Sequence, residues 1–149
     1  MTKINIKEFA TNESNNKGIN REHALCAYFG IERTKHDSTP YNEGSDIELT
    51  HMNISVKSSR ATLMSGNYCK TCHTFAGIWQ KYIVNTHSDT FAYVTNDYIA
   101  YFMDKKEFSK FMHTFARLTR ESQKNGGHLK IQIYEESKKM VRWLEERVA

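Results

Sequence analysis

The sequence predicts a mixed α/β domain with a central sheet of about five strands and helices packed on it. Five short segments alternate apolar and polar residues, as half-buried strands do, and four others carry apolar residues at helical spacing. The length of 149 residues suits one folded unit. We expect residues 1–18, which are polar and rich in asparagine, to be a potentially mobile N-terminal segment, and residues 19–149 to form the domain.

The first part of the chain predicts one helix and two strands. The helix covers residues 20–29, with Asn20 as its N-cap and Gly30 as its end. Residues 46–49 and 53–57 then alternate in period two, which predicts two strands joined by a tight connection.

The remaining elements are expected in the order loop, helix, hairpin, helix, strand, helix. They cover residues 60–72 (loop), 73–86 (helix), 90–95 and 98–103 (hairpin), 105–118 (helix), 129–133 (strand) and a final helix that buries Met140, Leu144 and Val148. Asp104 and Glu107 have the spacing of a capping box, which marks the start of the third helix.

Charge and hydropathy exclude some classes of protein. No run of about 18 apolar residues exists, so no transmembrane helix is expected. The N-terminus lacks the apolar core of a signal peptide, which favours a cytoplasmic location. The net charge of +4 and a pI near 8.9 are compatible with a polyanionic partner such as nucleic acid.

The stretch GSDIELTHMNISVKSS, residues 44–59, places two acids, a serine and a lysine on the two expected strands. A tight hairpin would set Asp46 opposite Lys57 and Glu48 opposite Ser55, with all four on one face, and a slip by one alternation would keep that face intact. Carboxylates bind a hard cation such as Mg²⁺, and a nearby lysine can orient a water and stabilise charge on a phosphate. Alternatively, the aspartate and the lysine form an ordinary cross-strand ion pair.

A strand with an acid, a turn, and a second strand ending in a lysine follow a helix that carries Glu22. Together with the helix, strands and closing helix that come after, this order resembles the PD-(D/E)xK nuclease superfamily, which has the restriction-endonuclease-like fold. The resemblance covers roughly residues 18–105 and implies hydrolysis of DNA phosphodiester bonds that depends on Mg²⁺ or Mn²⁺. It implies that Asp46 is the metal-binding acid, Lys57 the catalytic lysine, the backbone carbonyl of Val56 a further metal ligand, and the helix glutamate an acid of the same cluster.

The sequence departs from the family pattern at Ser55, because the family usually has an acid or glutamine two residues before the lysine. No Asp or Glu occurs between Glu48 and Asp89, so the following helix cannot easily supply the missing carboxylate. It must come from Glu48, which the expected register places opposite Ser55, or from Glu22. If neither acid reaches the site, the domain is a catalytically inactive module that binds nucleic acid or protein.

Three cations follow the expected site and are candidates for contacts with DNA phosphates: Arg60, Lys70 and Lys81. Alternatively, these side chains are solvated charges. A chain of this length is short for cutting both strands of a duplex alone, so a homodimer or a larger complex is expected.

Cys69, Cys72 and His73 form a Cys-x-x-Cys-His sequence that suggests a different chemistry. They could supply part of a four-ligand zinc site and make the chain a zinc-binding protein, although no second Cys-x-x-Cys exists to complete it. The same spacing attaches haem covalently in exported proteins. The simplest interpretation is two reduced thiols near the start of a helix.

Overall fold

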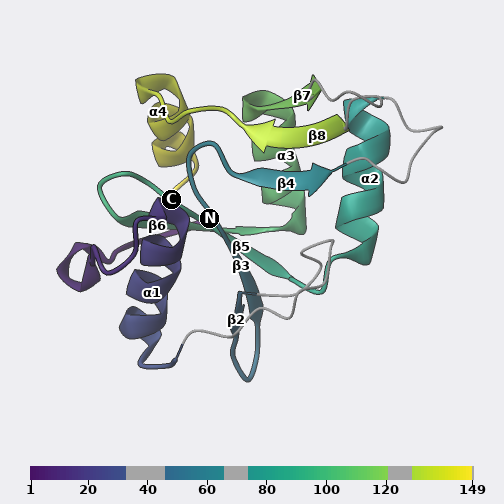
Figure 1. Cartoon of the computed structure of the whole chain (residues 1–149). Coiled ribbons are helices and arrows are strands. Elements are labelled where there is room, and N and C mark those ends of the chain that lie inside the picture. Colours follow the sequence, from purple (N-terminus) through teal and green to yellow (C-terminus); the bar gives the residue numbers. More distant parts are fainter. Residues whose placement is uncertain (33–45, 66–73, 121–128, 149) are drawn as a thin grey trace.

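The computed structural model describes residues 1–32, 46–65, 74–120 and 129–148, which form two sheets and the helices that cover them (Figure 1). The strands are β1 (Thr2–Asn5), β2 (Ile47–Glu48), β3 (Asn53–Lys57), β4 (Thr62–Ser65), β5 (Thr90–Val94), β6 (Ile99–Asp104), β7 (Ala116–Arg120) and β8 (Leu129–Ile133). The helices are α1 (Lys17–Phe29), α2 (Phe75–Asn85), α3 (Lys105–Phe115) and α4 (Lys138–Arg147), with a short 3-10 helix at Lys7–Phe9. None of the described helices is long and apolar enough to cross a membrane.

The main sheet has the strand order β1-β6-β5-β3-β2 and is mixed. β3 runs parallel to β5, whereas the other neighbouring strands are antiparallel. A parallel pair needs a crossover connection, and α2 lies in the connection from β3 to β5. The predicted α/β class, with a mixed five-stranded sheet flanked by helices, is therefore confirmed.

The N-terminal segment differs from the expectation. Residues 1–18 are expected to lie outside the domain, but Thr2–Asn5 forms an edge strand of the main sheet, paired with β6. Ile6, which follows directly, is fully buried, and its N–H donates to the carbonyl of Tyr98 at 2.9 Å. Two apolar side chains, Ile4 and Ile6, thus attach an otherwise polar stretch to the domain.

A second sheet, in the order β4-β8-β7, also departs from the expectation of one central sheet. The expected loop over residues 60–72 contains β4, and the expected helix ends at Phe115, so that Leu118 belongs to β7. β8, expected in the main sheet, buries two isoleucines completely and is therefore in the interior. An interior strand needs partners for its backbone N–H and C=O groups on both edges, and β4 and β7 supply them.

Helix α1 begins earlier than the sequence pattern indicates. Its N-cap is Asn16, whose side chain accepts from the N–H groups of Gly18 at 2.9 Å and Ile19 at 3.3 Å. Asn20, the expected cap, is buried within the helix and donates to the carbonyl of Ser14 at 2.7 Å. The helix therefore gains nearly one turn at its N-terminus.

Two other helix boundaries confirm the sequence pattern. The side chain of Asp104 accepts from the Glu107 N–H at 2.7 Å, and the Glu107 side chain accepts from the Asp104 N–H at 3.1 Å, so the capping box is present. Gly30 ends α1 with a φ of 69°, a left-handed conformation that glycine adopts without steric cost.

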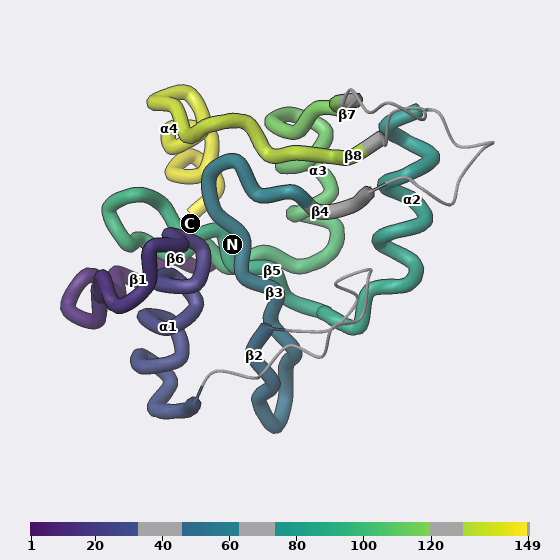
Figure 2. Tube along the Cα trace, viewed as in Figure 1, coloured from purple at the N-terminus to yellow at the C-terminus, as the bar shows by residue number. Residues whose placement is uncertain are grey.

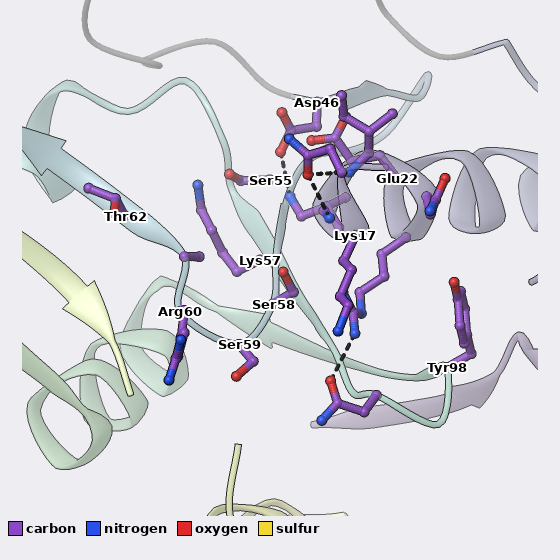
Figure 3. A pocket seen from close by; sticks show the side chains of 18 of the residues that line it. Lys17, Glu22, Asp46, Ser55, Lys57, Ser58, Ser59, Arg60, Thr62 and Tyr98 are labelled. Carbon is purple, nitrogen blue, oxygen red and sulfur yellow. Dashed lines mark hydrogen bonds between the residues drawn. The ribbon is translucent and has the colours of Figure 1, made fainter. Parts of the chain in front are cut away.

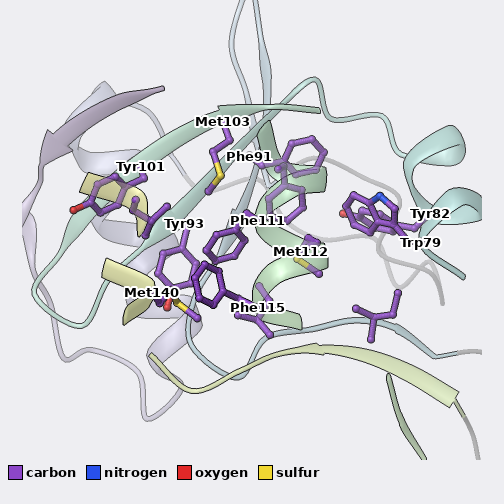
Figure 4. Packing of buried hydrophobic residues seen from close by; sticks show 14 of the residues in the cluster. Trp79, Tyr82, Phe91, Tyr93, Tyr101, Met103, Phe111, Met112, Phe115 and Met140 are labelled. Atoms are coloured by element: carbon purple, nitrogen blue, oxygen red, sulfur yellow. The ribbon is translucent and has the colours of Figure 1, made fainter. Parts of the chain in front are cut away.

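Apolar side chains fill both faces of the main sheet because side chains alternate along each strand. On β5, Phe91 and Tyr93 face the cluster formed with α2, α3, α4 and β8, whereas Ala92 and Val94 face α1. Figure 4 shows the first, larger cluster, in which Phe91 stacks on Phe108 with ring centroids 4.2 Å apart. The second sheet shares this cluster, so both sheets are parts of one packed unit.

The chain crosses from the main sheet to the second sheet directly after Lys57. Figure 2 shows the tube leaving β3, passing through residues 58–61 and entering β4. The N–H of Ile133 donates to a carbonyl of this segment at 2.9 Å, and the N–H of Glu136 donates to Ser59 Oγ at 2.8 Å. The segment after Lys57 is thereby fixed between the sheets.

A hydrogen bond between β6 and α4 gives a prediction about stability. Tyr101 Oη donates to Glu145 at 2.5 Å, and Lys3 Nζ donates to the same carboxylate at 3.0 Å. These bonds, that of Tyr101 first, lower the pKa of Glu145, so their stabilisation is present above the ordinary carboxyl pKa and is lost as the pH falls through the lower folded-state pKa. We expect Tyr101→Phe to lower the free energy of unfolding at pH 7 and to lower it less at pH 3. Urea unfolding at both pH values tests this, and an equal loss at both would contradict it.

Candidate active site

A groove of about 860 Å³ opens where the start of α1, the end of β3 and the β5–β6 turn meet. Its described lining is largely polar and charged. Figure 3 shows Asp46, Ser55 and Glu22 toward one end of the view and Ser59 and Arg60 toward the other. The groove thus holds the chemistry-bearing residues of the two strands together with residues of helix α1.

Asp46 lies directly before β2 and is held by β3. Its N–H donates to the carbonyl of Ile54 at 2.9 Å, and its Oδ2 accepts from the N–H of Val56 at 2.6 Å. The observed pairing of β2 with β3 puts Asp46 opposite Ser55, not opposite Lys57 as expected. The register is shifted by one alternation, which leaves the polar residues on a common face.

The backbone carbonyl of Val56 points toward the edge of β3 where Asp46 lies. Carbonyl groups two residues apart on a strand point the same way, and the carbonyl of Ile54 accepts from Asp46. At Val56 the strand has passed beyond the bounds of β2, so its N–H bonds to the Asp46 side chain and not to a strand. A carboxylate and a carbonyl can therefore converge on one cation here.

Ser55 and Lys57 are both buried residues that line the groove. Their side chains are 1% and 9% exposed, and neither forms a hydrogen bond or an ion pair with any residue that the structure describes. The Lys57 ammonium is not among the buried polar atoms that lack a partner in the described part of the chain, so the aliphatic stem is buried while the charged end reaches the groove. Lys57 thus presents to the groove an ammonium that no described residue pairs with.

The structure separates the two glutamates that could replace the missing carboxylate. Glu22, on α1, lines the groove and is half-buried, whereas Glu48 is exposed, pairs with Asn53 across β2 and β3, and lies outside the described lining. The register shift causes this, because it places Asp46 opposite Ser55, where Glu48 was expected. Glu22 is therefore the glutamate of the two that shares the groove with Asp46.

Two cations of the groove, Lys17 and Arg21, were not among the sequence candidates. Arg21 is buried and donates to Asn96 Oδ1 at 2.8 Å and to the Thr95 carbonyl at 3.4 Å, so it ties α1 to the β5–β6 turn. This contact also fixes the neighbouring Glu22 beside the groove. Recognition of Asn16 as the N-cap would have drawn attention to both residues, since it places them in the first helical turns.

Backbone strain is concentrated at the groove. Among the described non-glycine residues, Arg60 and Tyr98 have a positive φ, each 60°, and both line the groove. Such a conformation costs about 1 kcal/mol or more and is often found at functional sites. The two strained residues are therefore an independent observation that points to a functional role for the groove.

Of the other candidates, Arg60 lines the groove and pairs with Glu135 at 2.8 Å. Lys81 lies on α2, exposed and outside the groove's described lining. The candidates Lys70, Cys69, Cys72 and His73 lie outside the described residues.

The groove contains oxygen groups of the kind that bind a hard divalent cation. No group of three or more His, Cys, Asp or Glu side chains occurs in the described part of the chain. Mg²⁺ does not require such a group, since it is often held by one or two carboxylates together with waters and substrate phosphates. Asp46, Glu22 and the Val56 carbonyl are the oxygen groups of this kind that we consider for a cation in the groove.

Comparison with known proteins adds no relative: the chain matches no family model, no curated protein and no solved structure.

Proposed function

We propose that this protein is a Mg²⁺-dependent endonuclease that hydrolyses DNA phosphodiester bonds, with the restriction-endonuclease-like site of the PD-(D/E)xK superfamily. The observation that carries the proposal is Lys57, which directly follows Val56 and lines the same groove as Asp46, with an ammonium that has no partner among the described residues. An ammonium held there without a partner is explained if a phosphate becomes its partner. A homodimer or a larger complex is the expected working form on duplex DNA.

Each residue has a distinct role in the proposed reaction. Asp46, Glu22 and the Val56 carbonyl would hold the cation, which when bound polarises a phosphate oxygen and lowers the pKa of a water. Lys57 orients the attacking water and stabilises the negative charge that grows on the phosphate. Attack breaks the bond to the 3′ oxygen, which leaves a 5′-phosphate.

Cation binding tests the metal site without relying on activity. Asp46→Asn should abolish the stabilisation that Mg²⁺ or Mn²⁺ gives to the folded protein, a gain of about 2.7 kcal/mol at a hundred times Kd. Asp89→Asn is the matched control, because Asp89 also accepts from a β3 amide, that of Asn53 at 3.0 Å, but does not line the groove. Thermal unfolding with and without the cation provides the measurement.

Two results would count against the proposed cation site. One is the same cation-induced stabilisation in Asp46→Asn as in the wild type. The other is a loss of stabilisation in Asp89→Asn of the same size as in Asp46→Asn. DNA binding without cation binding or cleavage would favour the inactive binding module.

A further inference from the structure

The solvent-facing side of the second sheet carries polar, cationic and aromatic groups. Along β8, Ile131 and Ile133 are buried, so Lys130 and Gln132 face the other way. The strand pairing puts Arg117 of β7 opposite Gln132, on this same outward side. This outer face is distinct from the apolar face that the second sheet turns toward α3.

Tyr134 and Arg117 form a stacked pair at one end of this outer face. The guanidinium carbon of Arg117 lies 5.0 Å from the centre of the Tyr134 ring, and the tyrosine is 43% exposed. Its backbone is fixed, because its N–H donates to the carbonyl of Phe115 at 3.0 Å. A large aromatic ring is therefore presented at the surface from a hydrogen-bonded backbone, beside a planar cation.

A hollow of about 460 Å³ lies beside this pair and adjoins the candidate active site. Arg60 and Glu135 line both the hollow and the groove, so the two depressions meet at this ion pair. A long ligand that extends from the groove past Arg60 therefore reaches Arg117 and Tyr134. The described charges that line the hollow are Arg60 and Arg117 and the acid Glu135, with which Arg60 pairs at 2.8 Å.

We propose that this outer face binds a single-stranded segment of the DNA substrate, with one base stacked on the Tyr134–Arg117 pair. The inference rests on the proposed function and extends it, because it names the class of substrate. Exposed aromatic rings and guanidinium planes bind unpaired bases by stacking, while flanking cations follow the phosphates. A base inside a duplex is already stacked on both sides and cannot use the ring. The preferred substrate is therefore DNA with an unpaired segment next to the cleaved bond.

Fluorescence anisotropy with oligo(dT) and with a duplex of equal length, both in EDTA to prevent cleavage, tests the proposal. Tyr134→Ala and Arg117→Ala should each weaken oligo(dT) binding by about 5- to 100-fold and duplex binding by less than about 3-fold. Tyr134→Phe keeps the ring and should retain wild-type affinity. Arg147→Ala is the matched control, since Arg147 also stacks on an aromatic ring, that of Trp143, but lines neither depression.

Several results would overturn the inference: unchanged oligo(dT) binding in both alanine variants, an equal loss in Arg147→Ala, or tighter binding of oligo(rU) than of oligo(dT). If the wild-type protein cleaves DNA in Mg²⁺ and the alanine variants bind oligo(dT) normally, the proposed nuclease function is supported and only the proposed binding surface is rejected. If the variants lose affinity for oligo(dT) as expected but the wild-type protein never cleaves DNA, the binding surface is supported and the proposed nuclease function is rejected.

Discussion

Replacing Lys57 by methionine is expected to remove most DNA cleavage while leaving the stability of the folded protein nearly unchanged. The ammonium of Lys57 faces the groove and has no partner among the described residues, so its removal should change the free energy of unfolding by less than about 1 kcal/mol. Methionine keeps most of the apolar stem and fills the same space. The same change removes the group that stabilises charge on the phosphate, which should cost about 10²- to 10³-fold in rate.

A large loss of activity with little change in stability distinguishes a functional lysine from a structural one. Urea unfolding and single-turnover cleavage of the two proteins under the same conditions give both quantities. Lys106→Met on α3 is the control, because Lys106 is exposed and lies outside the groove; it should change stability by less than about 0.5 kcal/mol and leave cleavage intact. A Lys57→Met protein that is clearly less stable than the wild type would contradict the account of an unpartnered charge.

The second large effect concerns the acid that stands in for the missing carboxylate. Glu22→Gln should lower the cleavage rate by about 10²-fold or more, whereas Glu48→Gln should stay within about 3-fold of the wild type. The reason is geometric: Glu22 lines the groove, and Glu48 is exposed outside its described lining. Both substitutions exchange a carboxylate for an amide of equal size, so each is the control of the other.

Cleavage rates measured over a range of Mg²⁺ concentrations separate cation binding from other effects. A Glu22 variant that recovers at high Mg²⁺ has lost a ligand, as proposed. Loss of activity in Glu48→Gln with normal activity in Glu22→Gln would contradict this assignment. It would make Glu48 the metal ligand, as the register expected from the sequence suggests.

The sequence predicts local features well where a periodic pattern or a cap decides them. The hairpin of β5 and β6 and the capping box of Asp104 and Glu107 depend on neighbouring residues, and the structure confirms both. The common polar face of Asp46, Ser55 and Lys57 also follows from strand alternation alone, which is why it survives a change of register.

Features set by tertiary contacts could not be read from local patterns. The β2–β3 register depends on the hydrogen bonds that Asp46 makes to β3, and it decides which glutamate is near the groove. The second sheet forms because β8 pairs with strands that are distant in sequence. A four-residue segment such as β4 is too short for its residue pattern to predict a strand. The polar N-terminus joins the main sheet through two isoleucines that composition alone obscures.

The most direct test of the central claim is cleavage of plasmid, single-stranded and branched DNA by the purified protein, in Mg²⁺ or Mn²⁺ and in EDTA. We predict cleavage that requires the cation, leaves 5′-phosphate ends and disappears in both Asp46→Asn and Lys57→Met. Failure to cleave any of these substrates, or cleavage that persists in both variants, would contradict the proposal that this groove is a nuclease active site.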